Sequence, residues 1–314
     1  MLAIRTSNLI DGTGRALEDM VVLVQGERIT KVGKAEGVEI PEDARLIDAL
    51  GRTVMPGMID AHVHVMGSGD PKEQASGLRI VRESEGTLAL KSYANAKRDL
   101  EAGFTAIRDV GCFAYVDVAL RNAINSDWVD GPRMRVGGQP LTVTGGHFDL
   151  TKGLASHVSI VGLTNTADSA EEGRRAARTQ LKMGIDFIKI AATSSEYVRR
   201  IGGLYSQEMA LETMRAICEV AHWAGRKVAA HCHGGNGVRD AILAGVDSLE
   251  HGHFLSDELL EMMVERGVYL VPTMSFEGRA MEHGQKKRGL MIRIGAGSSK
   301  QLKRCTMLWS VLTR

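Results

Sequence analysis

The sequence predicts an α/β protein: a (β/α)₈ TIM-like barrel, incomplete because seven strands are recognisable, that follows a small all-β segment. Two observations predict this class. Residues 1–55 hold short alternating runs, whereas from Pro56 onward apolar runs of four to six residues alternate with longer helical stretches. We expect three segments: a small β portion over 1–55, a barrel over 56–284 and an atypical basic tail over 285–314.

The N-terminal segment has the chemistry of β-hairpins. Its alternating runs, 20–25 and 28–32, are interrupted at Gly26-Glu27, and Asp11-Gly12 interrupts the chain earlier. Pairs that contain glycine favour the tight turns between antiparallel strands. We therefore expect hairpins here.

The barrel segment contains seven candidate strands, each an apolar run bounded by turn residues. They lie at residues 57–65, 105–110, 133–137, 187–191, 228–232, 248–251 and 268–272. Between two of them, residues 206–224 have apolar side chains near helical spacing, and Gly225 follows where a C-terminal glycine belongs. In a barrel of this kind the reactive groups lie at the carboxyl ends of the strands.

Composition excludes several classes of function. A chain of 314 residues with 44% hydrophobic content can bury a sizeable core, and its net charge of +1 does not favour nucleic acid or membrane as a partner. The four cysteines form no Cys-x-x-Cys pair, which indicates reduced thiols rather than a disulfide framework or sulfur-ligated zinc. The first ten residues do not resemble a signal peptide, so we expect a cytoplasmic protein.

Three His-x-His pairs are the most informative motif: His62 and His64, His231 and His233, His251 and His253. Side chains two apart on a strand point the same way, so such a pair at a strand end aims two imidazoles at one point. Imidazole is the commonest metal ligand at neutral pH. Both residues of the first pair are therefore candidate ligands. In the other two pairs the first histidine ends its strand and is the better candidate, while the second lies in the following loop and serves the substrate or nothing.

Lys189 lies inside the apolar run 187–191, where a charged ammonium group would be costly to bury. Burial favours the neutral amine, which can add carbon dioxide to form a carbamate, an anionic bidentate ligand that bridges two metal ions. The alternative is a lysine that reaches solvent at the strand end or pairs with an acid.

In this order, these motifs resemble the amidohydrolase superfamily, in particular its imidazolonepropionase-like and prolidase-like (Xaa-Pro dipeptidase-like) branch. The resemblance covers residues 1 to about 280. It is carried by GMIDAHVH at 57–64, IRDVG at 107–111, IK at 188–189, AHCHG at 230–234 and LEHG at 249–252.

The resemblance implies a barrel flanked by a small β-sandwich built from both chain ends. It also implies two divalent metal ions, for which imidazole ligands favour zinc, with carboxylated Lys189 as the bridging ligand. His62 and His64 complete one site, and His231 and His251 complete the other. We therefore expect a metal-dependent hydrolase that cleaves an amide or peptide bond in a small molecule, such as a dipeptide or N-acyl amino acid, with a metal-activated hydroxide.

Three further positions refine this expectation. Lys189, together with Gly234 where related deaminases place a glutamate, favours amide hydrolysis over deamination. His147, in the loop after the third strand, is a candidate catalytic residue that polarises the substrate carbonyl; the alternative is a surface-loop histidine. For Arg108, near a strand end, we expect a salt-bridge or packing role.

The end of the chain departs from the family pattern. In the family the eighth strand ends in an aspartate that binds one metal and accepts the proton of the attacking water. Residues 285–314 contain lysines and arginines but neither aspartate nor glutamate. We interpret this as a C-terminal truncation or frameshift, and an open barrel with uncovered strand edges favours a homo-oligomer.

Two other functions stay open. The chain could be a catalytically impaired fragment, which keeps the metal ligands and lacks the general base. It could also hydrolyse cyclic amides, as relatives similar to imidazolonepropionase or dihydroorotase do.

Overall fold

The computed structural model describes residues 1–69, 82–158, 160, 162, 165–194 and 206–275. The chain divides into two compact units, Met1–Met58 and Ile59–Arg314. The expected tail at 285–314 and the expected eighth strand lie outside the described residues. Within the described part, no helix is both long and apolar enough to cross a bilayer.

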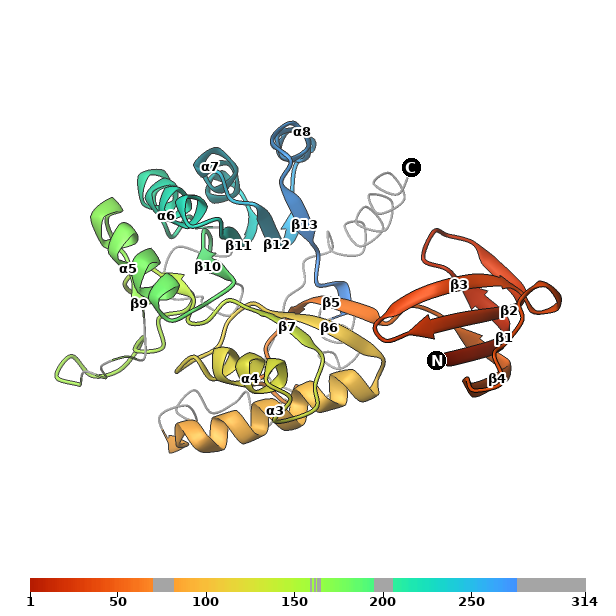
Figure 1. The fold of residues 1–314 in the computed structure, drawn as a ribbon. Coiled ribbons are helices and arrows are strands. Elements are labelled where there is room, and N and C mark those ends of the chain that lie inside the picture. The colour runs from red at the N-terminus through yellow and green to blue at the C-terminus, as the bar shows by residue number, and fades with distance from the viewer. Residues whose placement is uncertain (70–81, 159, 161, 163–164, 195–205, 276–314) are drawn as a thin grey trace, which may run out of the picture. The chain divides into compact units, whose positions relative to one another are not determined.

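The first unit is a four-stranded sheet in the order β3-β2-β1-β4 (Figure 1). Its elements are β1 Leu2–Ile10, β2 Ala16–Gln25, β3 Arg28–Lys34, the 3₁₀ turn η1 Ala35–Gly37 and β4 Arg45–Val54. β1 and β2 pair antiparallel, as do β2 and β3, whereas β1 and β4 pair parallel. Both expected turns connect these antiparallel pairs. The described residues of this unit form one sheet, and they do not show the second sheet of a sandwich.

The second unit alternates strands and helices from β5 to β13 (Figure 1). Its strands are β5 Met58–Val63, β6 Phe104–Asp109, β7 Arg133–Val136, β8 Leu141–Thr142, β9 Asn165–Thr166, β10 Phe187–Ala191, β11 Lys227–Gly234, β12 Ser248–Phe254 and β13 Tyr269–Val271. Its helices are α3 Glu85–Glu101, α4 Val116–Asn125, α5 Ala170–Lys182, α6 Leu211–Trp223, α7 Asn236–Ala244 and α8 Asp257–Arg266. All seven predicted strands are present; the short β8 and β9 were not predicted.

These strands form two parallel sheets. One has the order β13-β12-β11-β10-β8-β9, and the other has the order β5-β6-β7. Strand pairs in both sheets, such as β6 with β7 and β10 with β11, are parallel. Parallel sheets and alternating helices agree with the predicted α/β class. A single closed barrel is not formed among the described strands.

The large sheet and its helices share one apolar core. β10 is buried along its whole length, and α5 to α8 run beside strands β10 to β13 in chain order (Figure 1). Ile188, Ile190, Met214 and Ile217 are all fully buried in this core. Every residue of β10 is buried, so its one charged side chain, Lys189, lies inside the described structure.

Helix ends follow the local sequence closely. Ser84, Ser169 and Ser256 cap α3, α5 and α8 by accepting a backbone N–H three residues ahead. The predicted helix at 206–224 begins later than expected, at Leu211. Gln207 instead forms a β-bridge with Thr193, which keeps this segment extended before the helix. Gly225, in the left-handed region at φ 66°, ends α6 as predicted.

Candidate active site

Seven histidines gather at the carboxyl ends of β5, β11 and β12 and in the loop after β8. The ring centroids of His62 and His251 are 4.9 Å apart, and those of His231 and His251 are 4.6 Å apart. The ring centroids of His64 and His62 are 5.4 Å apart. The four histidines that we predicted as ligands, His62, His64, His231 and His251, therefore belong to one cluster. Residues separated by almost 190 positions along the chain thus meet at the carboxyl ends of strands that belong to the two parallel sheets.

The register explains which side chains share the inner face. Lys189 lies opposite Ala229, and His231 lies opposite Glu250. Side chains alternate along a strand, so Glu250 faces the cluster and His251 should face away from it. His251 has φ 75°, however, in the left-handed region, and this turn of the backbone returns its ring to the cluster.

Two of the imidazoles have their tautomers set by the partner of Nδ1. His64 Nδ1 lies 2.8 Å from the carbonyl oxygen of Gly111, and His62 Nδ1 lies 2.7 Å from Glu250 Oε2. A carbonyl or carboxylate oxygen only accepts, so in both rings Nδ1 carries the proton and Nε2 keeps its lone pair. This arrangement suits metal ligands, because an acceptor on one ring nitrogen orients the other nitrogen toward the metal.

The remaining candidate ligands are arranged differently. His251 Nδ1 lies 2.8 Å from Thr273 Oγ1, a hydroxyl that can donate or accept. The Nε2 atom of His231 is buried and has no hydrogen-bond partner within the described chain. A buried ring nitrogen without a partner is costly unless a group that the protein binds satisfies it.

Burial keeps these histidines neutral. It lowers the pKa of His62, His147 and His233 to about 3 and that of His253 to about 4. Burial also lowers the pKa of His64, and it takes the pKa of His231 and His251 well below the ordinary value. At neutral pH each ring therefore has one nitrogen lone pair to offer.

Lys189 lies among these rings and is only 1% exposed. Its charge lowers the pKa of six histidines: His62, His64, His147, His231, His233 and His251. Burial lowers the pKa of the amine itself to about 8, and Nζ has no hydrogen-bond partner among the described residues. The interpretation of Lys189 as a strand-end lysine that reaches solvent is therefore wrong.

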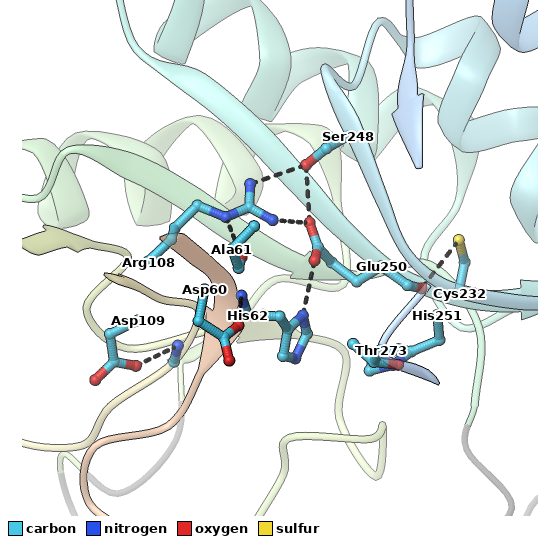
Figure 2. A network of polar contacts seen from close by, with 11 residues as sticks. Asp60, Ala61, His62, Arg108, Asp109, Cys232, Ser248, Glu250, His251 and Thr273 are labelled. Atoms are coloured by element: carbon cyan, nitrogen blue, oxygen red, sulfur yellow. Dashed lines mark hydrogen bonds and ion pairs between the residues drawn. The ribbon is translucent and has the colours of Figure 1, made fainter. Parts of the chain in front are cut away.

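Glu250, for which we predicted no role, forms an ion pair next to His62 (Figure 2). Glu250 is fully buried; its Oε2 accepts from His62, and its Oε1 accepts from Arg108 Nη2 at 2.6 Å. The salt-bridge role expected for Arg108 is confirmed. Burial alone would raise the pKa of Glu250, but Lys189, the hydrogen bond from His62 and the charge of Arg108 hold it at about 2.

His147 is packed into the cluster rather than left in a surface loop. Its ring stacks on that of His231, with centroids 4.0 Å apart and planes inclined by 16°. Its backbone N–H donates to Glu208 Oε2 at 2.7 Å, and Lys152 Nζ donates to its carbonyl oxygen at 3.1 Å. The Nδ1 atom of His147 is buried and has no hydrogen-bond partner in the described part of the chain, so it is available to form a hydrogen bond with a bound molecule.

The second histidine of each later pair also reaches the cluster. We expected His233 and His253 in loops, but β11 extends to Gly234 and β12 to Phe254, so both lie on strands. Their Nδ1 atoms are 3.1 Å apart, which requires one to donate and the other to accept. The register shift between Cys232 and Gly234 accompanies this extension.

A second group of potential ligands, Asp109, Cys112 and Asp117, lies buried nearby in the chain. The carboxylate oxygens of Asp109 accept from the backbone N–H groups of Val65 and Gly111. Those of Asp117 accept from the N–H groups of Val118 and Gly138. Because every carboxylate oxygen already has a backbone donor, this group stabilises the loops that follow β6 and β7.

Comparison with known proteins agrees with this geometry. The model of the amidohydrolase family matches residues 53–305, most of the chain. The chain belongs to the amidohydrolase family. Proteins of this superfamily generally use divalent metals.

The similar proteins include an ochratoxinase and solved structures of a Xaa-Pro dipeptidase and a prolidase. Ochratoxinase from Aspergillus niger is 32% identical over 284 residues, which are 85% of this chain and 57% of that protein. The crystal structure of a Xaa-Pro dipeptidase with bound methionine in the active site has 31% identity and a TM-score of 0.80, covering 91% of this chain and 70% of that one. A prolidase complexed with N-methylphosphonate-L-proline has 29% identity and a TM-score of 0.78, over 91% and 69% of the two chains. The present chain thus spans little more than half the length of ochratoxinase.

Proposed function

We propose that this chain is a metal-dependent hydrolase that cleaves the amide or peptide bond of a small substrate such as a dipeptide or an N-acyl amino acid. The observation that carries the proposal is the environment of Lys189: a buried amine without a hydrogen-bond partner in the described structure, surrounded by neutral imidazoles. Burying a charged amine that makes no hydrogen bond is costly, and the charge of Glu250 offsets this cost only in part, since the pKa of Lys189 stays lowered.

Neutral imidazoles, together with an amine that can become a carbamate, are donors that suit two divalent ions. His62, His64 and Lys189 would hold one, and Lys189, His231 and His251 would hold the other. With a pKa of about 8, roughly a tenth of the Lys189 amine is neutral at pH 7. The neutral amine would attack carbon dioxide: an N–C bond would form, one C=O π bond would open to give a carboxylate oxygen, and one proton would pass from the nitrogen to water. The resulting carbamate offers two oxygens, which is what a bridging ligand needs, and zinc is the ion we propose because imidazole ligands favour it.

When bound, such ions would supply Lewis acidity, which would polarise the scissile carbonyl and would favour hydroxide over water near neutral pH. The chain's own residues would bind the substrate and exclude bulk water. His147, neutral and stacked on His231, is placed to hold the substrate carbonyl oxygen through a ring N–H. The buried strands around Lys189 exclude bulk water from the cluster, which strengthens each of these polar contacts.

A catalytically impaired fragment is the second candidate. It is favoured by the lack of any aspartate or glutamate in residues 285–314, where the family's eighth-strand acid would be expected. Such a chain would bind metal through the same histidines and would turn over slowly, because residues 285–314 supply no carboxylate to accept the proton of the attacking water.

A substrate panel tests the proposal and separates these candidates. The purified chain is loaded with zinc and bicarbonate and assayed on dipeptides, N-acyl amino acids and cyclic amides. Hydrolysis of the open-chain amides that disappears in Lys189→Ala but persists in Lys182→Ala, a surface control at the end of α5, supports the hydrolase. Metal binding without turnover supports the impaired fragment, and turnover of cyclic amides alone contradicts the proposed substrate class.

A further inference from the structure

A buried polar network joins three strands directly behind His62 (Figure 2). Arg108 on β6 donates from Nε to the carbonyl oxygen of Ala61 on β5 at 2.6 Å. The same guanidinium donates to Glu250 Oε1 at 2.6 Å and to Ser248 Oγ at 3.2 Å, both on β12. Ser248 Oγ donates to Glu250 Oε1 at 2.8 Å. One oxygen of Glu250 is thus occupied by two donors, and the other is left for His62.

The two carboxylate oxygens of Glu250 have different partners, and this difference sets the direction of the hydrogen bond between Glu250 and His62. Oε1 accepts from a guanidinium and a hydroxyl, while the hydrogen bond of Oε2 within the described structure is to His62 Nδ1, at 2.7 Å. A carboxylate paired with a guanidinium has no proton to donate, so the imidazole must be the donor. The Glu250 side chain is 0% exposed, so water does not compete for this contact.

We propose that Glu250 is a positioning residue that fixes His62 as the Nδ1–H tautomer and keeps the Nε2 lone pair free for a metal ion, with Arg108 determining which oxygen of Glu250 faces the ring. The role of Nε2 as a ligand rests on the proposed metal-dependent function. The tautomer assignment does not rest on that function, because it follows from the hydrogen bonds of Glu250 with His62, Arg108 and Ser248.

The substitution Glu250→Gln should change the tautomer of His62. The amide has only one acceptor oxygen, and the cationic Arg108 together with Ser248 attracts it more strongly than the neutral His62 does. The NH₂ group then faces His62 Nδ1, which must become an acceptor, so the ring proton moves to Nε2. The size and shape of the side chain barely change, but the ligand atom is blocked.

In the double variant Arg108→Met/Glu250→Gln we expect this change of the His62 tautomer to be reversed. Without the guanidinium, the amide NH₂ can donate to Ser248 Oγ, and its oxygen can turn to accept from His62. The Nδ1–H tautomer returns. A purely structural role of the ion pair predicts the opposite, because removing both partners would disturb the strands at least as much as removing one charge.

Nitrogen NMR of the metal-free protein with labelled histidine tests the tautomer, with His62 signals identified by their loss in His62→Ala. We expect Nδ1–H in the wild type, Nε2–H in Glu250→Gln and Nδ1–H again in the double variant. Nε2–H in the wild type overturns the proposal without any variant, and so does an unchanged Nδ1–H tautomer in a folded Glu250→Gln protein.

Zinc titration tests the consequence for the ligand. We expect Glu250→Gln to weaken binding roughly 10- to 100-fold, as losses of partners behind a ligand do, and the double variant to recover most of it. Asp186→Asn, which breaks the ion pair with Arg121 outside the histidine cluster, is the matched control and should bind as the wild type does. Equal zinc affinity in the wild type and a tautomer-switched Glu250→Gln protein overturns the proposed ligand role. A wild type that binds no zinc while the tautomers switch as expected contradicts the metal-dependent function and leaves the tautomer assignment standing.

Discussion

Glu250 and His251 are neighbours on β12, yet both side chains reach the same cluster: Glu250 contacts His62 directly, and the ring of His251 lies 4.9 Å from that of His62. The regular alternation of a strand would send them to opposite faces. The left-handed backbone at His251, with φ 75°, makes both contacts available. Thr273, itself at φ 48°, holds the displaced ring through a 2.8 Å hydrogen bond.

This backbone conformation predicts that two substitutions of His251 differ in their effect on the free energy of unfolding. Asparagine tolerates the left-handed region, whereas a β-branched residue does not. We expect His251→Val to unfold more easily than His251→Asn by about 1–3 kcal/mol, the usual cost of a strained backbone position. Urea unfolding of the metal-free proteins measures this. Equal stability of the two variants would show that the left-handed backbone at His251 carries no strain.

The stacked position of His147 predicts a role in turnover rather than in metal binding. His147→Phe keeps a flat ring against His231 but removes the N–H donor. We expect kcat to fall roughly 100-fold, the usual effect of losing one donor to a developing oxyanion, while the metal content is retained. Steady-state kinetics and elemental analysis on the same preparation measure both. Loss of metal together with activity would instead assign His147 to the ligand set.

Removal of metal should lower the thermal stability of the chain. A ligand at 100 times its Kd stabilises the native state by about 2.7 kcal/mol, which corresponds to roughly 5–10 °C in Tm for a protein of this size. We expect a chelator to lower Tm by this amount and zinc to restore it. Calorimetry of Lys189→Ala is the control, since its Tm should respond weakly to either treatment.

The ion pairs of Asp247 predict a pH dependence away from the site. Burial alone would raise the pKa of Asp247, but hydrogen bonds from Lys227, His222 and the backbone of Val228 lower it below 3.8. The native state therefore holds the proton less tightly than the unfolded chain. The stabilisation is complete above pH 3.8 and is lost as the pH falls toward the lowered native pKa.

Asp247→Asn should accordingly destabilise the protein more at pH 7 than at pH 3. Urea unfolding at the two pH values measures the difference, with Asp43→Asn as an exposed control. A penalty that is the same at both pH values would mean that the charge of Asp247 contributes nothing and that only its packing matters.

Much of this arrangement could be predicted from the sequence. The apolar runs ending in histidine predicted the strands, and the two-residue spacing predicted the imidazoles of His62 and His64 near one point. Glu250 was missed, although it satisfies the criterion that singled out Lys189: a charged residue inside an apolar strand. Arg108 on β6 is a third example, and the opposite signs of Arg108 and Glu250 would have predicted a buried ion pair.

Other features could not be read from local pattern. The left-handed φ of His251 is accompanied by a hydrogen bond with Thr273, 22 residues away, and strand alternation alone would have excluded this residue as a ligand. The stacking of His147 on His231 depends on how Glu208 and Lys152 hold the loop. Such positions are decided by tertiary contacts between distant segments, which a single sequence does not reveal.

The most direct test of the central claim is the metal content per chain, measured by elemental analysis after growth with zinc and bicarbonate, for the wild type and Lys189→Ala. We predict about two ions per chain in the wild type, the number of a carbamate-bridged pair, and a clear loss in the variant. Equal metal content in the two proteins, or none in the wild type, would contradict a centre built on Lys189.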